Sequence, residues 1–399
     1  MSGLFLTPAQ RRAVSPDAEH PVPPRPARVG VVGSGFRART LLRVMDALPA
    51  WFQVVGVAAR AEEARGLLRD HGFAAVETVG QLVGLRPDFV VDTLPAGPSQ
   101  EVLHRLADAG VPALTETPAA ATVRELAALA DRVQSGACVH VAEQYHLEPL
   151  VAAQLAVAAS GRLGAVTDAH VSIAHDYHGI SVLRRALDAG FEPPVITARR
   201  DRRRVLPSPS RYADPTDLAP VDTVHALAWL DFPAGRDGTA RLGVYEFDDV
   251  QYRSWVRSPS LLVRGERGEI RDGTVRSVDV SGQPALGRLE RVAAGGAGNH
   301  EGLFLRGYRL DGEWQYLNRF RPARLADEEL SIAEQLAGMA EHVLAEGPAP
   351  YEVAEAAQDQ YLQLLVREAA DAGQPVEAER MPWAGGRGCR GAGGRGGLR

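Results

Sequence analysis

A glycine-rich turn between an apolar run and an amphipathic segment constrains the fold more than any other feature. The turn follows residues 29–32 and reads Gly33-Ser34-Gly35-Phe36-Arg37-Ala38. Gly33 permits a tight turn, Gly35 lets the backbone approach a pyrophosphate, and Ala38 permits close helix–strand packing. Because a helix N-terminus offers unpaired N–H groups to an anion, the turn predicts the first βα unit of a dinucleotide-binding domain.

The alternation of strands and helices continues to about residue 148. Apolar runs occupy residues 52–57, 89–91, 111–114 and 138–142, and segments with helical periodicity occupy residues 36–48, 61–71, 99–109 and 123–133. Strands that alternate with helices form a parallel sheet covered on both faces. We therefore expect an α/β protein with a Rossmann domain over residues 28–148.

The second half of the chain has a different pattern. Helices are expected at residues 150–160, 180–189, 327–345 and 353–372, and strands at residues 165–173, 241–247, 251–256, 260–263, 269–271 and 274–278. This order predicts a C-terminal α+β domain over residues 149–380 with an open, mainly antiparallel sheet. An open sheet face favours a homodimer or homotetramer packed through that sheet.

Composition narrows the possible classes of protein. The 399 residues carry a formal net charge of -6, which predicts neither nucleic acid nor membrane as a partner. Residues 1–27 are expected to form a flexible leader without the features of a signal peptide, and residues 381–399 a disordered glycine/arginine tail. Two cysteines, Cys138 and Cys389, are too few for a disulfide framework or a thiolate metal cage, so we expect a cytoplasmic protein without a metal site.

The chain contains no lysine, so all 44 of its basic residues are arginine. This absence excludes a Schiff base, a P-loop lysine and a lysine general acid. It also excludes a short-chain dehydrogenase, which needs a Tyr-x-x-x-Lys pair. The two cysteines do not provide the cysteine-rich metal site of a zinc alcohol dehydrogenase.

The end of the second expected strand bears on cofactor choice. A site for NAD places a carboxylate there, whereas this sequence reads Val57-Ala58-Ala59-Arg60. Arg60 can form a charge-assisted fork with a ribose 2′-phosphate, and Ala59 removes the repelling carboxylate. The pattern favours NADP(H) over NAD(H). The alternative is that Arg60 is an ordinary solvated residue at the start of a helix.

Four further motifs follow the glycine turn in a fixed order. They are Asp92-Thr93-Leu94-Pro95, Leu114-Thr115-Glu116-Thr117-Pro118, Ser160-Gly161-Arg162-Leu163-Gly164-Ala165-Val166 and Gly265-Glu266-Arg267-Gly268-Glu269-Ile270. Over residues 28–375 this order resembles the Gfo/Idh/MocA oxidoreductases. The resemblance implies hydride transfer between NAD(P) and a sugar, cyclitol or related small molecule. It also implies cofactor contacts from Leu94, Pro95, Glu116 and Pro118.

The sequence departs from that family at its hallmark Glu-Lys-Pro motif. Thr117 stands where the family has the lysine that hydrogen-bonds the reacting oxygen. A threonine hydroxyl can donate a hydrogen bond but is a poor acid or base at neutral pH. Family branches without this lysine, such as thiazolinyl imine reductases, reduce imines with another residue as proton donor.

A second family landmark is a histidine that opens a helix in the second domain. His178 takes that position, with Asp176 two residues before it and Tyr177 as an additional donor. His178 is the candidate proton donor, and Asp176 is expected to orient it or raise its pKa. The alternative is a capping or core histidine. His175, Asp176 and His178 also suggest a metal site, but no second cluster supplies the remaining ligands.

The segment that ends the Rossmann half resembles the family's domain-crossing segment. Gln144, Tyr145 and His146 are the candidate substrate contacts, and the alternative is that Tyr145 and His146 pack the seam between domains. The arginine-rich residues 199–204 are interpreted as an exposed loop, and the alternative is a contact with an anionic substrate.

Two functions remain open from the sequence. The first is an NADP(H)-dependent oxidoreductase that transfers hydride to or from a sugar-like or other small carbonyl or imine substrate. The second is a catalytically silent NADP(H)-binding sensor or scaffold, which the missing lysine favours.

Overall fold

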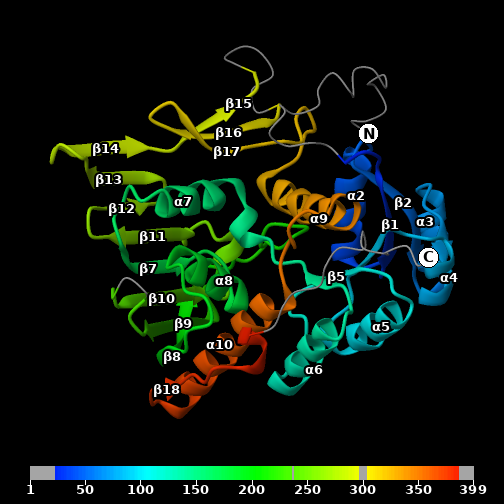
Figure 1. The fold of residues 1–399 in the computed structure, drawn as a ribbon, viewed down its shortest axis with the longest axis horizontal. Helices are drawn as coiled ribbons and strands as arrows, with labels where there is room; N and C mark the ends of the chain where they lie inside the picture. Colours follow the sequence, from blue (N-terminus) through cyan, green and yellow to red (C-terminus); the bar gives the residue numbers. More distant parts are fainter. Residues whose placement is uncertain (1–22, 236–237, 296–302, 386–399) are drawn as a thin grey trace, which may run out of the picture.

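The computed structural model describes residues 23–235, 238–295 and 303–385. The expected leader up to residue 22 and the expected tail from residue 386 lie outside these residues. Figure 1 shows two halves side by side, one in blue and cyan and the other in green to red. No helix in the described ranges is long and apolar enough to cross a membrane.

A parallel sheet forms the first half. Within the described residues its six strands follow the order β3 (Ala75–Val76), β2 (Phe52–Ala58), β1 (Ala27–Val32), β4 (Phe89–Asp92), β5 (Ala113–Thr115) and β6 (Val139–Val141). Every pairing between neighbours is parallel. The strand order reverses between β1 and β4, and ligands bind such sheets beyond the carboxyl ends of the strands at that point. The predicted Rossmann fold is confirmed.

Helices connect these strands and bury their apolar faces on the sheet. They are α2 (Phe36–Ala47), α3 (Glu62–Asp70), α4 (Val79–Gly84), α5 (Ala96–Asp108) and α6 (Val123–Gln134). Leu41, Leu42 and Met45 form part of the buried face of α2. Val90 and Val91 of β4 are completely buried, as expected for a strand with helices over both faces.

The second half contains the large sheet, nine strands in the described part of the chain. Their order is β14 (Pro284–Arg288), β13 (Thr274–Val278), β12 (Gly268–Arg271), β11 (Ser260–Gly265), β7 (Val166–Ser172), β10 (Arg241–Asp248), β9 (Val221–Phe232), β8 (Val195–Val205) and β18 (Val376–Glu377). Only β7 and β10 pair in parallel. The predicted antiparallel sheet is therefore confirmed.

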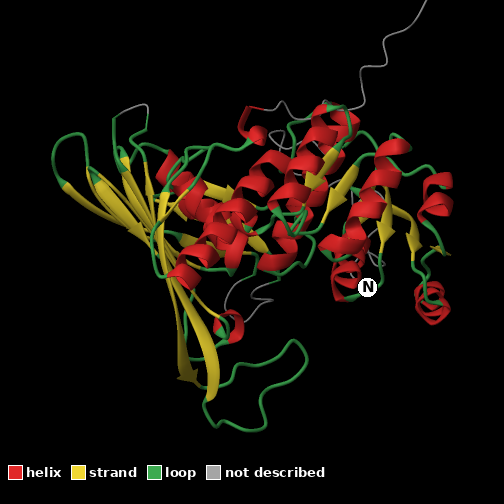
Figure 2. Ribbon diagram, turned by 90° about the horizontal axis from the view of Figure 1, so that it is seen from below, coloured by secondary structure: helices red, strands yellow, loops and turns green. Residues whose placement is uncertain are grey.

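A smaller sheet and the remaining helices complete the second half. The small sheet consists of β15 (Glu290–Ala293), β16 (Leu305–Leu310) and β17 (Glu313–Leu317). The α-helices are α7 (Pro149–Ala159), α8 (Asp176–Ala186), α9 (Asp327–Ala345) and α10 (Val353–Ala372). Short 3-10 helices are η1 (Tyr145–Leu147), η2 (Gln251–Arg253) and η3 (Pro382–Gly385). Figure 2 shows helices against one face of the large sheet and, among described residues, none over the other. The side chains follow the same division, since Ala228 and Leu230 are buried while Trp229 between them is exposed.

Three expectations for the second half are wrong in detail. Residues 251–256 form η2 and a loop rather than a strand, because the Gln251 amide turns inward and donates to the Ser172 carbonyl at 2.7 Å. The arginine-rich residues 199–204 belong to β8, which pairs along its whole length with β9. The ordered chain also continues past residue 380, since the Trp383 indole is buried and donates to Gln358 at 3.0 Å.

A buried ion pair joins α8 to α10. Arg184, which is 2% exposed, donates to the Asp359 carboxylate at 2.6 Å and to Glu355 at 2.9 Å. The Tyr351 hydroxyl also donates to Asp359, at 2.5 Å. Burial raises the pKa of Asp359 to about 6, although the Arg184 charge opposes the rise. Arg184 therefore compensates a charge that has no access to water.

We expect Arg184→Met to lower the free energy of unfolding by about 3–5 kcal/mol, because it leaves Asp359 buried without its cation. Urea titration monitored by circular dichroism measures this loss. Arg105→Met, which breaks an exposed ion pair with Glu101, is the control and should change little. An Arg184→Met/Asp359→Asn double variant that loses as much as the sum of the single variants would contradict this account.

Candidate functional site

A cavity of about 660 Å³ lies at the carboxyl ends of the parallel strands, where the two halves meet. Its wall combines the glycine turn, the segments after β4, β5 and β6, the start of α8 and η2. The lining residues are Phe36, Arg37, Thr93, Leu94, Pro95, Glu116, Thr117, Gln144, Tyr145, Glu148, Ile173, His175, Tyr177, His178, Arg211, Gln251, Tyr252, Arg253, Pro259 and Glu328. Most of the residues expected from sequence are therefore brought together here.

His178 and Glu143 form the central pair of this cavity. The His178 Nδ1 donates to Glu143 Oε2 at 2.6 Å, and the other carboxylate oxygen accepts the Tyr145 backbone N–H at 3.1 Å. Both side chains are nearly buried, the carboxylate more completely. Because Glu143 occupies Nδ1, the Nε2 atom is the imidazole position left for exchange of a proton with a bound molecule.

The expected role of Asp176 is wrong. Its backbone lies in the left-handed region, with φ +51°, and its carboxylate is turned toward α10. It accepts hydrogen bonds from Gln363 at 2.7 Å and from Arg367 at 2.8 Å. Burial raises the pKa of Asp176, but the His175 imidazole at 3.3 Å and the Arg367 charge outweigh it and hold that pKa below its usual value. Glu143 orients His178 instead of Asp176, which lines a neighbouring cavity of about 400 Å³.

Two pairs of hydroxyl-bearing side chains flank His178. The Thr117 side chain lies beside the Tyr177 hydroxyl, and the Tyr177 ring lies 4.4 Å from the His178 ring, centroid to centroid. On the other side the Tyr145 ring lies 4.6 Å from the His178 ring and 6.0 Å from the Tyr252 ring. Burial raises the pKa of Tyr177 and of Tyr145, so both phenols stay protonated at neutral pH.

Arg37 places a positive charge in the cavity wall, but other side chains hold it in position. Its Nε donates to Glu116 at 2.5 Å, and another of its nitrogens donates to the Gln144 side chain. The paired carboxylate keeps the pKa of Arg37 above its usual value in spite of burial. Glu116, the first residue of the Glu-Thr-Pro sequence, thus links the glycine turn to the segment after β5.

The glycine turn has the shape of a phosphate cradle. Gly33 has φ +112°, and a Cβ there would lie 2.3 Å from the Thr93 hydroxyl, so the fold itself requires this glycine. A Cβ on Gly35 would meet nothing within 4 Å. Gly35 opens α2, whose first turn has neither a capping side chain nor an acidic residue. These features fit a bound pyrophosphate.

The turn that follows β2, formed by Ala59 and Arg60, does not line the cavity. Arg60 is exposed, and Ala59 before it is buried. Arg65 of α3 braces this turn by donating to the Ala59 and Arg60 carbonyls at 2.8 and 2.6 Å. Glu62 accepts from Arg65 and Arg69 and is therefore neutralised by its own helix.

The remaining expected residues divide between the wall and its surroundings. Leu94 and Pro95 line the cavity, whereas Ser34 and Pro118 do not. His146 also faces away from it: its ring packs on Tyr351 at 5.2 Å between centroids, and burial lowers its pKa well below the usual value. His146 therefore packs the seam between the halves, as the alternative interpretation held.

Sequence reasoning missed Glu143, Tyr252 and Glu148. Glu143 is the first residue of the crossing segment, residues 143–149, but its partner comes 35 positions later. Tyr252 was assigned to a strand, which concealed its position in the wall. Glu148 lines the cavity, and burial together with the charges of Glu328, Asp327 and Glu143 raises its pKa to about 7.

We expect the Glu148 carboxyl to titrate near pH 7 in ¹³C NMR of glutamate-labelled protein. Glu148→Gln should remove that signal, and Glu328→Gln should move the midpoint down by removing a like charge. As pH rises from 4.5 through about 7, the unfolded chain loses this proton before the folded chain, so stability falls. Glu148→Gln should therefore stabilise the protein at pH 8 but not at pH 4; equal effects at both would refute the shift.

Comparisons with known proteins find one matching family model and several solved structures with a similar fold. The family model described as "Oxidoreductase family, NAD-binding Rossmann fold" (GFO_IDH_MocA) matches residues 27–145. A comparison with curated protein sequences finds no match.

Several solved structures share the fold across both halves. An oxidoreductase from Agrobacterium radiobacter in complex with NAD+, L-tartaric acid and magnesium has a TM-score of 0.62 and 16% identity, covering 88% of this chain and 98% of that one. Levoglucosan dehydrogenase in complex with NADH and levoglucosan has a TM-score of 0.62 and 17% identity, covering 90% and 100%. A putative NADPH-dependent oxidoreductase from Desulfitobacterium hafniense has a TM-score of 0.60 and 13% identity, covering 89% and 98%.

These findings agree with the order of motifs along the chain and with the β3-β2-β1-β4-β5-β6 sheet. The match to the family covers the part of the chain that carries the glycine turn and the Glu-Thr-Pro sequence. Residues 27–145 of this chain are therefore similar to the Gfo/Idh/MocA family of NAD-binding oxidoreductases.

Proposed function

We propose that the protein is an NAD(P)(H)-dependent oxidoreductase, with NADP(H) preferred, acting on a sugar-like or other small carbonyl or imine substrate. The observation that carries this proposal is the His178–Glu143 pair in a cavity bounded by the glycine turn. A nicotinamide dinucleotide bound along that turn would supply or accept the hydride.

The chain's own residues would hold the dinucleotide by its phosphates and adenosine end. The uncapped start of α2 offers backbone N–H groups to the pyrophosphate, and Gly35 leaves room for it. Arg60 stands at the end of β2, where a 2′-phosphate distinguishes the two nicotinamide cofactors. The absence of an acid at Ala59 and the neutralised Glu62 favour the extra phosphate.

His178 is the residue that would move the proton. In reduction, the imidazolium gives its Nε2 proton to the substrate oxygen or nitrogen; in oxidation, neutral His178 takes that proton back. Glu143 holds the imidazole in position through Nδ1. The protonated Tyr177 hydroxyl, beside Thr117, would donate a hydrogen bond to the same atom, near the position that the family gives to a lysine.

The substrate is expected to be small and polar. The cavity has about 660 Å³ for the reacting part of the substrate and the cofactor together, and amide, phenol and guanidinium groups line it. Levoglucosan dehydrogenase, a structural neighbour, binds an anhydrosugar. A hydroxylated ligand of similar size would find donors and acceptors on several sides here.

We also propose a homodimer or homotetramer formed through the large sheet. The face without helices presents Trp229 and Val195, which are both 38% exposed. Leu227, Leu242 and Val244 alternate onto the same face by strand periodicity. The same face also carries the ion pairs His170–Glu246 and Arg264–Asp168. Exposed apolar side chains bordered by polar residues are typical of protein–protein contacts.

A binding protein without catalysis is the second candidate. Thr117 stands at the lysine position, and the chain has no lysine to replace it. In that case the cavity would sense NADP(H) or present it to a partner, and His178 would only hold the ligand.

For cofactor binding, we expect Gly35→Ala to weaken NADPH and NADH about tenfold or more, a loss of ~1.4 kcal/mol, without changing stability. The new methyl group meets no protein atom and would enter the proposed phosphate space. Arg60→Ala should weaken NADPH by about 1.5–3 kcal/mol, the usual value of a charged hydrogen bond, and leave NADH unchanged. Fluorescence titration measures both affinities.

The control is Arg124→Ala, which removes an exposed arginine from the first turn of α6. Equal losses for Arg60→Ala and Arg124→Ala would refute a 2′-phosphate contact. Equal affinity of the wild-type protein for NADH and NADPH would also refute that contact.

For catalysis, we expect His178→Gln to lower the rate of NADPH oxidation about 10²–10⁴-fold, the usual contribution of a positioned acid, while NADPH affinity stays the same. Stopped-flow assays with carbonyl and imine panels measure the rate. Glu143→Gln should reduce it less, because the amide can still hold the imidazole at Nδ1 but without a charge.

His104→Gln, on the exposed face of α5, is the matched control. Turnover in His178→Gln at the wild-type rate would exclude His178 as the proton donor. Tight NADPH binding by the wild type without turnover of any substrate in the panel would instead support the sensor.

A further inference from the structure

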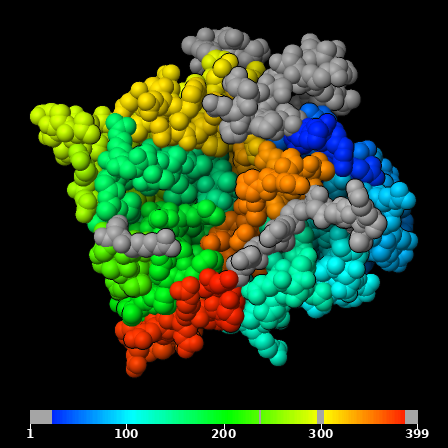
Figure 3. All heavy atoms as spheres, viewed as in Figure 1, coloured from blue at the N-terminus to red at the C-terminus, as the bar shows by residue number. Residues whose placement is uncertain are grey.

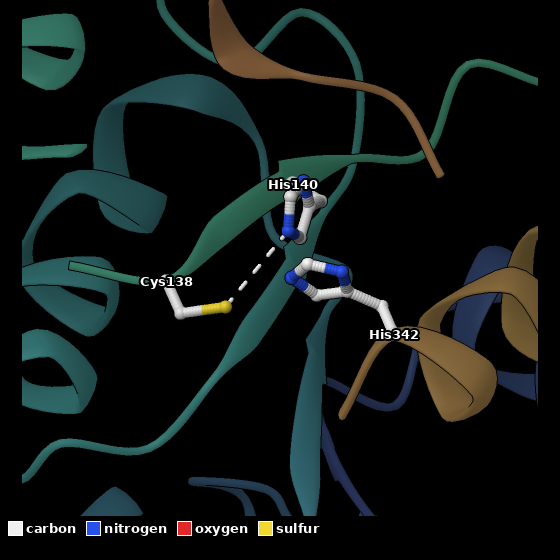
Figure 4. Close-up of side chains that lie close together, drawn as sticks. All are labelled: Cys138, His140 and His342. Atoms are coloured by element: carbon white, nitrogen blue, oxygen red, sulfur yellow. Dashed lines mark hydrogen bonds between the residues drawn. The ribbon is translucent and has the colours of Figure 1, made fainter. Parts of the chain in front are cut away.

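Three side chains with metal-binding atoms meet outside the cavity. Cys138 and His140 lie at the edge strand β6, and His342 comes from α9. Figure 4 shows the three side chains converging, and their ligand atoms lie within 4.8 Å of one another. None of the three lines the cavity of the His178 pair.

The local backbone explains why two of the ligands share a face. Successive side chains of a strand point to opposite sides, so Cys138 and His140, two residues apart, point to the same side. The Cys138 Sγ and His140 Nε2 are 3.8 Å apart. Tetrahedral zinc, with Zn–S of about 2.3 Å and Zn–N of about 2.0–2.1 Å, places such atoms about 3.6 Å apart.

His342 already has the hydrogen bond that a metal-binding histidine normally makes. Its Nδ1 donates to the Gly347 carbonyl at 2.9 Å. This bond fixes the tautomer in which Nε2 carries the lone pair. In Figure 4 one ring nitrogen of His342 is turned toward Cys138 and His140.

Burial is graded across the cluster. His140 and His342 are buried, whereas Cys138 is partly exposed. An ion would therefore enter from the Cys138 side, and water could complete the coordination there. One thiolate and two imidazoles are ligands that zinc prefers, whereas magnesium and calcium prefer oxygen ligands.

We propose that Cys138, His140 and His342 bind a divalent transition-metal ion of the zinc class, with water as a fourth, tetrahedral ligand. Binding converts the Cys138 thiol to a thiolate, and the proton passes to solvent.

The position of the cluster indicates a structural role. It would join the edge of the Rossmann sheet to α9, which packs against α2 and which Figure 3 shows, in orange, on the surface between the two halves. A β-bridge between His140 and Glu352 already ties the same strand to the chain that follows α9. A metal ion here would strengthen the contact between the halves.

Cobalt titration of the full chain, after removal of metal with a chelator, tests the proposal. We expect one Co²⁺ per chain, with a thiolate-to-cobalt charge-transfer band and the intense visible bands of tetrahedral cobalt, displaced by Zn²⁺. Cys138→Ser should abolish the charge-transfer band and weaken binding at least tenfold. Cys389→Ser, which removes the chain's other cysteine, should leave both unchanged.

Thermal unfolding gives a readout that does not depend on catalysis. Zn²⁺ should raise the melting temperature of the wild type and of Cys389→Ser but not of Cys138→Ser, whose partly exposed side chain makes misfolding a minor risk. His342→Gln should likewise lose the rise in melting temperature with Zn²⁺. His170→Gln is the histidine control: it removes the imidazole that pairs with Glu246 on the large sheet, and it should keep that rise. No thiolate band in the wild type, or equal bands in the two cysteine variants, would overturn the proposal.

Discussion

The hydrogen bond from His178 to Glu143 is the interaction on which the arrangement of the site depends. It joins the segment that leaves the Rossmann sheet to the first turn of α8 in the second half. The carboxylate has no access to water, and its second oxygen accepts the Tyr145 N–H. Because both oxygens are used, the relative position of the halves and the orientation of the imidazole are fixed together.

The rest of the cavity shows how a chain without lysine can build a polar wall. Arg37 supplies the positive charge, but Glu116 and Gln144 hold it against the wall. Hydroxyl groups complete the wall, among them those of Tyr177 and Thr117. Burial raises the pKa of Tyr177 and of Tyr145, so both phenols stay protonated over the physiological pH range.

Sequence patterns predicted the larger elements well where the pattern is local. The glycine turn, the alternating strands and helices and the two long C-terminal helices all follow from period and turn chemistry. Prediction failed where a distant partner decides the conformation. The Gln251 amide turns inward to Ser172 and breaks an expected strand, and pairing with β9 turns an arginine-rich segment into β8.

By itself the sequence determined the Rossmann half, its glycine turn and the loss of the lysine, because each is a property of neighbouring residues. Only the tertiary structure decided that Glu143, rather than Asp176, orients His178. It also decided that His342 meets Cys138 and His140. The physical reason is the same in both cases: these partners lie far apart in the sequence, and only the packing of one half on the other brings them within bonding distance.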